Sequence, residues 1–240
     1  MVSRFWRAEE AGCQPALQAI KCFMPTPLPY RAYYHRHLPH YQPPDVTLFL
    51  TFRLHGSLPI EVVERLRAEA EEREQQIEKI ETLNDRKLAL YTERKRQFGR
   101  FDEALDASTY GPTWLKDVRI AAVVAEALLY RDEKVYELDC FTIMSNHVHA
   151  VFAPLQDETG AFYSLTRIMQ SLKRRTASLA NDLLGREGSF WQGESYDRVV
   201  RDEDEWQRIV WYVLNNPVKA GLVQEWREWP WTYFKYKDMM

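Results

Sequence analysis

The sequence has few cysteines, no long apolar run and no excess of positive charge. Its three cysteines, Cys13, Cys22 and Cys140, form neither a CxxC pair nor a plausible disulfide framework. No stretch approaches the roughly 18 apolar residues that a membrane-spanning helix needs, and the first residues lack the apolar core of a signal peptide. We therefore expect a soluble protein of the reducing cytoplasm, with no membrane partner.

Charge is distributed unevenly along the chain. The formal net charge of −3 argues mildly against nucleic-acid binding, because phosphate contacts need cations. Between Glu158 and Asp182, however, basic residues occur without any acidic one, and residues 31–41 mix cations and histidines with tyrosines. Such clusters suit single strands, whose phosphates need charge and whose bases need flat partners, although a solvated helix face or an ordinary loop would look the same. The candidate contacts are Arg167, Lys173, Arg174 and Arg175 in the first cluster and Arg31 and Arg36 in the second.

The order of segments predicts an arm followed by a domain. Residues 1–44 are rich in proline and lack periodicity, so we expect an extended N-terminal arm before a domain over 45–240. Within that domain, residues 58–100 are dense in Glu, Arg, Lys and Gln, which predicts a long charged helical insertion, bent or paired. The insertion is either a solvated structural projection or a docking surface for a partner or nucleic acid.

The remaining segments predict an α+β fold. Stretches rich in β-branched and aromatic residues indicate strands, two of which are separated only by Ser145-Asn146 and so form an antiparallel hairpin. Helical spacing of apolar residues indicates helices between the strands. We expect a ferredoxin-like antiparallel sheet with helices on one face. The predicted strands are 45–54, 135–144, 147–155 and 196–200. The predicted helices are 113–130, 163–184 and 203–215, and a loop at 101–112 precedes the first of them.

The first chemical signal is a pair of histidines, His147 and His149, inside the apolar strand 147–155. Side chains alternate across a strand, so residues i and i+2 point to the same face and two imidazoles there can share one divalent metal ion. A hydrogen-bonded pair of core or surface histidines would give the same pattern. Both flanking segments are apolar, so the imidazoles would need partners to offset their desolvation.

The second signal lies in the predicted helix near the C-terminal end. Tyr212 and Asn216 are about 40° apart around a helix, so they share an edge of the apolar stripe. Pro217 predicts a helix boundary at Asn216, which would place Tyr212 in the final turn. A structural tyrosine at the rim of a core would look similar.

The two segments together resemble a known family. FTIMSNHVHAVF resembles the metal-binding strand of the HUH superfamily, and SYDRVVRDEDEWQRIVWYVLNNPVKAGLV resembles the nucleophile helix of the REP-associated tyrosine transposases, relatives of single-tyrosine insertion-sequence transposases. FRLHGSLP, YGPTWL and FWQ are consistent with it. The resemblance covers roughly residues 45–235, an HUH transposase-like domain. Ser145 stands where the family usually has proline, a change in the turn that should leave a metal site intact.

The resemblance implies roles for particular residues. His147, His149 and Asn216 would bind Mg²⁺ or Mn²⁺, with Mn²⁺ favoured by the nitrogen ligands, and Tyr212 would be the nucleophile. Tyr196, the competing tyrosine, falls at a position where relatives carry another aromatic residue and would be structural. Lys219, in the trailing NPVKAGLV, joins the candidate DNA contacts.

The implied function is metal-dependent cutting and strand transfer of single-stranded DNA through a 5′-phosphotyrosine, on a palindrome that forms a hairpin. A domesticated DNA-binding module without catalysis and a metal nuclease that uses water are the alternatives. The resemblance is compatible with a monomer or a homodimer, associated with the bacterial nucleoid.

Overall fold

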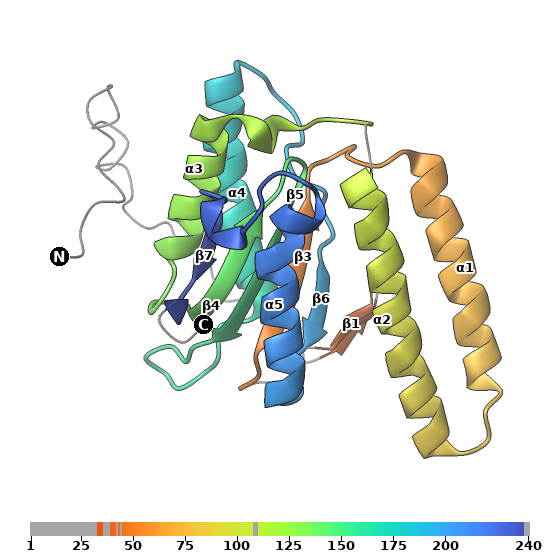
Figure 1. Ribbon diagram of the computed structural model, residues 1–240. Coiled ribbons are helices and arrows are strands. Elements are labelled where there is room, and N and C mark those ends of the chain that lie inside the picture. Colours follow the sequence, from red (N-terminus) through yellow and green to blue (C-terminus); the bar gives the residue numbers. More distant parts are fainter. Residues whose placement is uncertain (1–32, 36–38, 42, 44, 108–109, 238–240) are drawn as a thin grey trace.

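A central antiparallel sheet organises the molecule. The computed structural model describes residues 33–35, 39–41, 43, 45–107 and 110–237. Five strands pair in the order β6-β3-β5-β4-β7, and every pairing is antiparallel (Figure 1). All four predicted strands are present, and the three-residue β7 was not predicted. The strands are β3 (Leu48–Arg53), β4 (Tyr136–Ile143), β5 (His147–Pro154), β6 (Tyr196–Val199) and β7 (Thr232–Phe234).

The topology confirms the predicted α+β class. The elements follow the order β3, α3 (Val118–Leu129), β4, β5, α4 (Leu165–Leu184) and β6, which is the ferredoxin-like succession. Helices α3 and α4 pack together on one face of the sheet. Residues Leu50, Phe52 and Phe152 point into the core that these helices cover.

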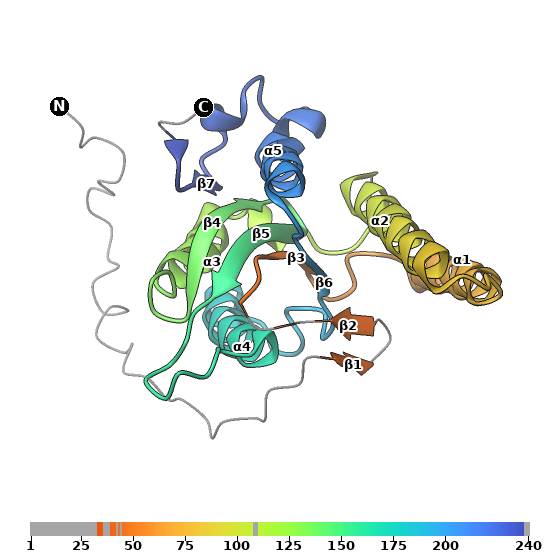
Figure 2. The ribbon, with the colours of Figure 1, turned by 90° about the horizontal axis from the view of Figure 1, so that it is seen from below.

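The prediction that the helices lie on one face is wrong for α5 (Glu203–Lys219). This helix packs on the opposite face, as Figure 2 shows. Phe49, Cys140 and Val151 point toward it and are buried among its apolar residues. Strands β3 and β5 therefore carry apolar side chains on both faces, so the sheet needs a covering layer on each side.

Helix α5 also runs past the predicted boundary at Asn216. Pro217 lies inside the helix and is buried with Val213 and Leu214. Proline lacks one backbone donor, but Ala220 N donates to Asn216 O at 3.0 Å and so continues the helical pattern. Tyr212 consequently lies well inside α5 and not in its last turn.

The charged insertion is a helical hairpin. Helices α1 (Ile60–Glu78) and α2 (Leu83–Ala107) lie side by side beyond the β6 edge of the sheet (Figures 1 and 2). The charged helical insertion is thus present, and of the two predicted forms, bent or paired, it takes the paired one. The loop predicted at 101–112 is wrong over 101–107, which belong to α2 because Leu105 is buried with Leu58 and Val63, next to Phe101.

Much of the predicted N-terminal arm lies outside the described residues. The described part of the arm contains two short strands, β1 (Tyr33–His35) and β2 (Pro39–Tyr41), which pair antiparallel. Strand β2 lies near β6 (Figure 2). Over the part of the chain that the structure describes, no helix combines the length and the apolar character needed to cross a membrane.

A side-chain hydrogen bond fixes the first half of α5 on the sheet. The Trp206 indole Nε1 donates to Asp139 Oδ2 at 2.7 Å, at a bulge in β4. We expect Trp206→Phe to lower the free energy of unfolding by about 1–3 kcal/mol, because the buried Asp139 carboxylate loses a partner. Chemical denaturation measures the change. Trp211→Phe, at an exposed position of the same helix, is the control, and equal effects of the two substitutions would contradict the assignment.

Candidate active site

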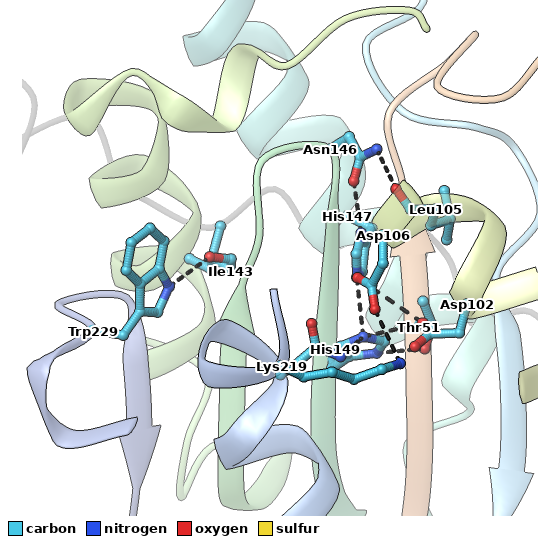
Figure 3. A network of polar contacts seen from close by, with 11 residues as sticks. Thr51, Asp102, Leu105, Asp106, Ile143, Asn146, His147, His149, Lys219 and Trp229 are labelled. Carbon is cyan, nitrogen blue, oxygen red and sulfur yellow. Dashed lines mark hydrogen bonds and ion pairs between the residues drawn. The ribbon is translucent and has the colours of Figure 1, made fainter. Parts of the chain in front are cut away.

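The two histidines lie on β5, the central strand of the sheet. Thr51 of β3 pairs with His149, and Arg53 pairs with His147. Both imidazoles point to the face that α5 covers, as the i, i+2 spacing predicted (Figure 3). His147 is 1% exposed and His149 is 0% exposed, so solvent does not reach either ring.

Neighbouring side chains hold both rings through their Nδ1 atoms. Thr51 Oγ1 lies 2.7 Å from His149 Nδ1, and Asn146 Oδ1 lies 2.7 Å from His147 Nδ1. The Asn146 amide nitrogen donates to Leu105 O at 3.0 Å, which fixes the carbonyl end of Asn146 toward the imidazole. His147 Nδ1 therefore carries the proton, and its Nε2 has a lone pair that points toward His149 Nε2, 3.0 Å away. Such partners orient histidines that bind metals.

Helix α2 brings carboxylates to the histidines. Asp102 Oδ1 lies 3.2 Å from His149 Nε2 and 4.0 Å from His147 Nε2. Asp106, one turn further along α2, places Oδ1 3.9 Å from His147 Nε2, and Lys219 Nζ lies 3.3 Å from Asp106 Oδ2 (Figure 3). From α5, Asn216 Nδ2 lies 3.3 Å from His149 Nε2.

Asp102, His147 and His149 form a buried group that could hold a metal ion. The two Nε2 atoms are 3.0 Å apart. Ligand atoms that share one ion at bond lengths of about 2.1 Å lie roughly 3.0–3.4 Å apart, which matches the shorter separations here. Among the described residues, Asp102 Oδ2 and Asn216 Oδ1 are buried without a hydrogen-bond partner, and Asp102 Oδ1 has the contact with His149 Nε2 at 3.2 Å. A cation would satisfy them.

Burial shifts the protonation of these groups. Burial, followed by the neighbouring His149, lowers the pKa of His147 to about 3, so this imidazole is neutral at pH 7 and able to ligate. Burial acts to raise the pKa of Asp102, but the His149 and His147 imidazoles outweigh it and the pKa lies below its ordinary value. Burial and the nearby Asp102 carboxylate raise the pKa of Asp106.

Tyr212, on α5, lies beside the two histidines of β5. Its ring centroid is 5.6 Å from that of His149 and 6.0 Å from that of Phe98 on α2. The Lys219 ammonium lies 6.0 Å from the Tyr212 ring centroid. The structure thus brings together four residues singled out in the sequence, namely Tyr212, His147, His149 and Asn216, with Lys219 next to them.

Tyr196 pairs with Thr51 at the edge of the site and lies in the packing between β6 and α2. Its ring is 4.5 Å from that of Phe98, and its hydroxyl donates to Arg94 O at 3.3 Å. Burial raises the pKa of the Tyr196 hydroxyl well above the ordinary value. These contacts agree with the structural role expected from the sequence.

The basic cluster at 167–175 is not brought to the histidines. These residues belong to α4, on the other face of the sheet. Lys173 Nζ donates to Gln192 O at 2.8 Å, whereas Arg174 is exposed beside a groove formed by α4 and residues 193–197. Arg31 and Arg36 lie outside the described residues.

Sequence reasoning missed the residues that complete the cluster. Asp102 and Asp106 fall in the segment predicted to be a loop, and Thr51 and Asn146 carry no local signature of their roles. One signal was available in FDEALD, because Phe101 and Leu105 have helical spacing and Asp102 and Asp106 then share a neighbouring face.

The fold and the site define a class: an α+β protein with a ferredoxin-like sheet and a His-His-Asp cluster next to a tyrosine. Two curated relatives carry the name REP-associated tyrosine transposase. The Haemophilus influenzae protein is 26% identical over 104 residues, covering 41% of this chain and 59% of the relative. The Escherichia coli protein is 22% identical over 102 residues, covering 42% and 56%. The resemblance found in the sequence is confirmed.

These similarities are partial. The chain spans less than three fifths of the length of either curated relative, since the matched regions cover 59% and 56% of the two relatives. A solved structure of a REP-associated tyrosine transposase bound to a REP hairpin has a TM-score of 0.44 and 14% identity, with 83% of this chain and 80% of that chain covered. No protein-family model matches the sequence.

The lowered pKa of His147 makes the metal-free protein sensitive to acid. The unfolded chain binds a proton near pH 6.5, whereas folded His147 does so only near pH 3, so the free energy of unfolding falls as the pH falls through this window. We expect the free energy of unfolding of His147→Gln to depend less steeply on pH than that of the unmodified protein. The slope should be smaller by up to about 1.4 kcal/mol per pH unit. Denaturant titrations from pH 7 to pH 4 in EDTA measure it.

The matched control is His55→Gln, because His55 is exposed and lies outside the cluster. This variant should keep the full pH dependence. An unchanged slope in His147→Gln would show that the His147 ring is not held neutral by its surroundings.

Proposed function

We propose that this protein is a metal-dependent single-stranded DNA endonuclease and strand-transferase that acts through a 5′-phosphotyrosine at Tyr212. One observation carries the proposal: the tyrosine ring lies 5.6 Å from the His149 ring, beside a buried group able to hold a metal ion. A nucleophile next to a cation is the arrangement that attack on a phosphodiester requires. The names of the two curated relatives support the same class.

His147, His149 and the Asn216 amide oxygen would hold Mg²⁺ or Mn²⁺, with Asp102 adding a carboxylate oxygen while no DNA is bound. When bound, the ion would orient the scissile phosphate and offset the charge that develops on it. Two imidazole nitrogens make the site softer than the all-oxygen sites typical of Mg²⁺, so Mn²⁺ should bind more tightly. Thr51 and Asn146 keep both imidazoles in the orientation that ligation needs.

Tyr212 performs the exchange of bonds. Its hydroxyl oxygen forms a bond to phosphorus while the bond to the 3′ oxygen breaks, and the leaving strand takes up a proton as a 3′-hydroxyl. The phenolic proton passes to water. Attack by a different 3′-hydroxyl reverses these steps and rejoins the strand, with no nucleotide consumed, because one phosphodiester replaces another.

Hairpin-forming single-stranded DNA is the proposed substrate, by resemblance to the transposase family. Arg167, Lys173, Arg174 and Arg175 on α4 are candidate contacts, as is Lys219 on α5. The α4 cluster lies across the sheet from Tyr212, so one strand would have to pass around the β6 edge to reach both.

Tyr212→Phe separates the possible functions. The substitution removes one oxygen and keeps the ring that packs against Phe49 and Phe98, so fold and DNA binding should be retained. We expect loss of both cleavage and the covalent adduct, measured with Mn²⁺ and labelled hairpin DNA on denaturing gels. Tyr196→Phe is the control and should retain both activities.

The other outcomes assign other functions. A nuclease that uses water would still cut after Tyr212→Phe and would form no adduct with the unmodified protein. A domesticated binding module would bind the DNA without cutting it. An adduct mapped to Tyr196 would contradict the choice of nucleophile.

The α4 cluster makes a separate prediction about binding. Arg174 is exposed and Arg175 partly exposed, so both can reach phosphates. Replacing both by Ala should weaken single-stranded DNA binding and reduce the log–log salt slope by about 0.7 for each phosphate that is no longer neutralised. Fluorescence anisotropy over a salt series measures the slope. Lys79→Ala, at the far end of α1, should leave it unchanged, and an unchanged slope in the α4 variant would remove this helix from the interface.

A further inference from the structure

The candidate site is closed. Asp102, His147, His149 and Asn216 are each at most 1% exposed. Tyr212 is itself partly buried, packed between Phe49 of the sheet and Phe98 of α2. A phosphodiester cannot reach these groups in this arrangement, because it needs direct contact with the tyrosine oxygen and the metal ligands.

Helix α2 closes the site, and the ferredoxin-like core does not need this helix. The hairpin of α1 and α2 lies between β3 and α3 in the chain, to the side of the sheet (Figure 2). Its own apolar cluster is small, with Leu58, Val63 and Leu105 buried against Phe101 and Ala104, and Phe98 is the α2 side chain that packs against the cluster under α5. Elements with few apolar contacts open at low free-energy cost.

The groups that α2 inserts resemble the substrate in charge and in donor atoms. Asp102 and Asp106 are spaced i, i+4, so both carboxylates leave one face of the helix toward the imidazoles and Lys219. Phosphodiester oxygens would make the same contacts with a cation and an ammonium group. Asp106 holds Lys219, which is one of the candidate DNA contacts.

The closed arrangement carries an electrostatic cost at Asp106. Within the described residues, Asp106 Oδ1 is buried without a hydrogen-bond partner, while Asp106 Oδ2 accepts from Lys219. The Asp102 carboxylate, one helical turn away, also repels the Asp106 carboxylate. Opening the site would return the Asp106 carboxylate to water and restore its hydration.

Side-chain contacts of Tyr91, away from the site, hold α2 against the start of α5. The Tyr91 hydroxyl of α2 donates to Glu205 Oε1 at the start of α5, and the Arg201 guanidinium lies 3.2 Å from the Tyr91 ring centroid. Glu205 also accepts from Arg201 N at 3.0 Å and lies 3.5 Å from Arg198, so it keeps partners when Tyr91 is changed.

We propose that the α1–α2 hairpin is a gate whose carboxylates, Asp102 and Asp106, occupy the place of the scissile phosphate, so that single-stranded DNA must displace α2 to reach Tyr212. This inference rests on the proposed function. Displacement frees Lys219 from Asp106 and lets a phosphate oxygen replace the Asp102 carboxylate beside the histidines. The gate thereby limits cutting to strands that bind well enough to open it.

Hydrogen exchange of residues 83–107 tests the gate without any cleavage. The full chain is measured in EDTA, alone and with single-stranded hairpin DNA. DNA binding should raise exchange in α2. Tyr91→Phe should raise it without DNA, by roughly three- to tenfold for one partly exposed hydrogen bond to a charged group, and should speed DNA association by a similar factor. Tyr130→Phe, an exposed tyrosine at the end of α3, should change neither.

The outcomes separate the gate from the proposed function. DNA binding without increased hydrogen exchange in α2 would overturn the gate alone. So would a Tyr91→Phe variant whose hydrogen exchange and rate of DNA association match those of Tyr130→Phe. Absence of any DNA binding would overturn both proposals.

Discussion

Two imidazole nitrogens 3.0 Å apart are the constraint on which the candidate site depends. At this separation His147 Nε2 and His149 Nε2 cannot both carry a proton, since each proton would point at the other. Asn146 and Thr51 occupy the Nδ1 atoms and prevent the rings from turning away. At least one Nε2 lone pair therefore faces the interior of the cluster, and the buried Asp102 carboxylate beside it favours a cation.

Both faces of the sheet carry an apolar core, and the candidate site lies at the start of β5 on the face that α5 covers. On β5, Val148, Ala150 and Phe152 are buried under α3 and α4, while the histidines alternate with them and face α5. A strand buried on both sides holds the two histidines rigidly, which is what a metal site requires. Two helices approach the histidines, with α5 bringing Tyr212 and Asn216 and α2 bringing Asp102.

Local patterns in the sequence were sufficient to predict the parts of the site that lie within one element. Strand geometry predicts that the i, i+2 histidines share a face, and helix geometry predicts that Tyr212 and Asn216 share an edge, whereas the family resemblance supplied their roles. Asp102 could not be found this way, because it reaches His149 only through tertiary packing of α2. The extension of α5 through Pro217 has the same cause, since burial against the sheet outweighs a local helix-breaking preference.

The central claim is that His147 and His149 hold one metal ion beside Tyr212. Pulsed electron paramagnetic resonance of Mn²⁺ bound to the protein tests it most directly, because imidazole nitrogens coupled to the ion give a nitrogen hyperfine signal. The account predicts two coordinated imidazoles, one in His147→Ala or His149→Ala, and two in His55→Gln. Manganese bound without imidazole coupling, or coupling that survives in full in both alanine variants, would contradict it.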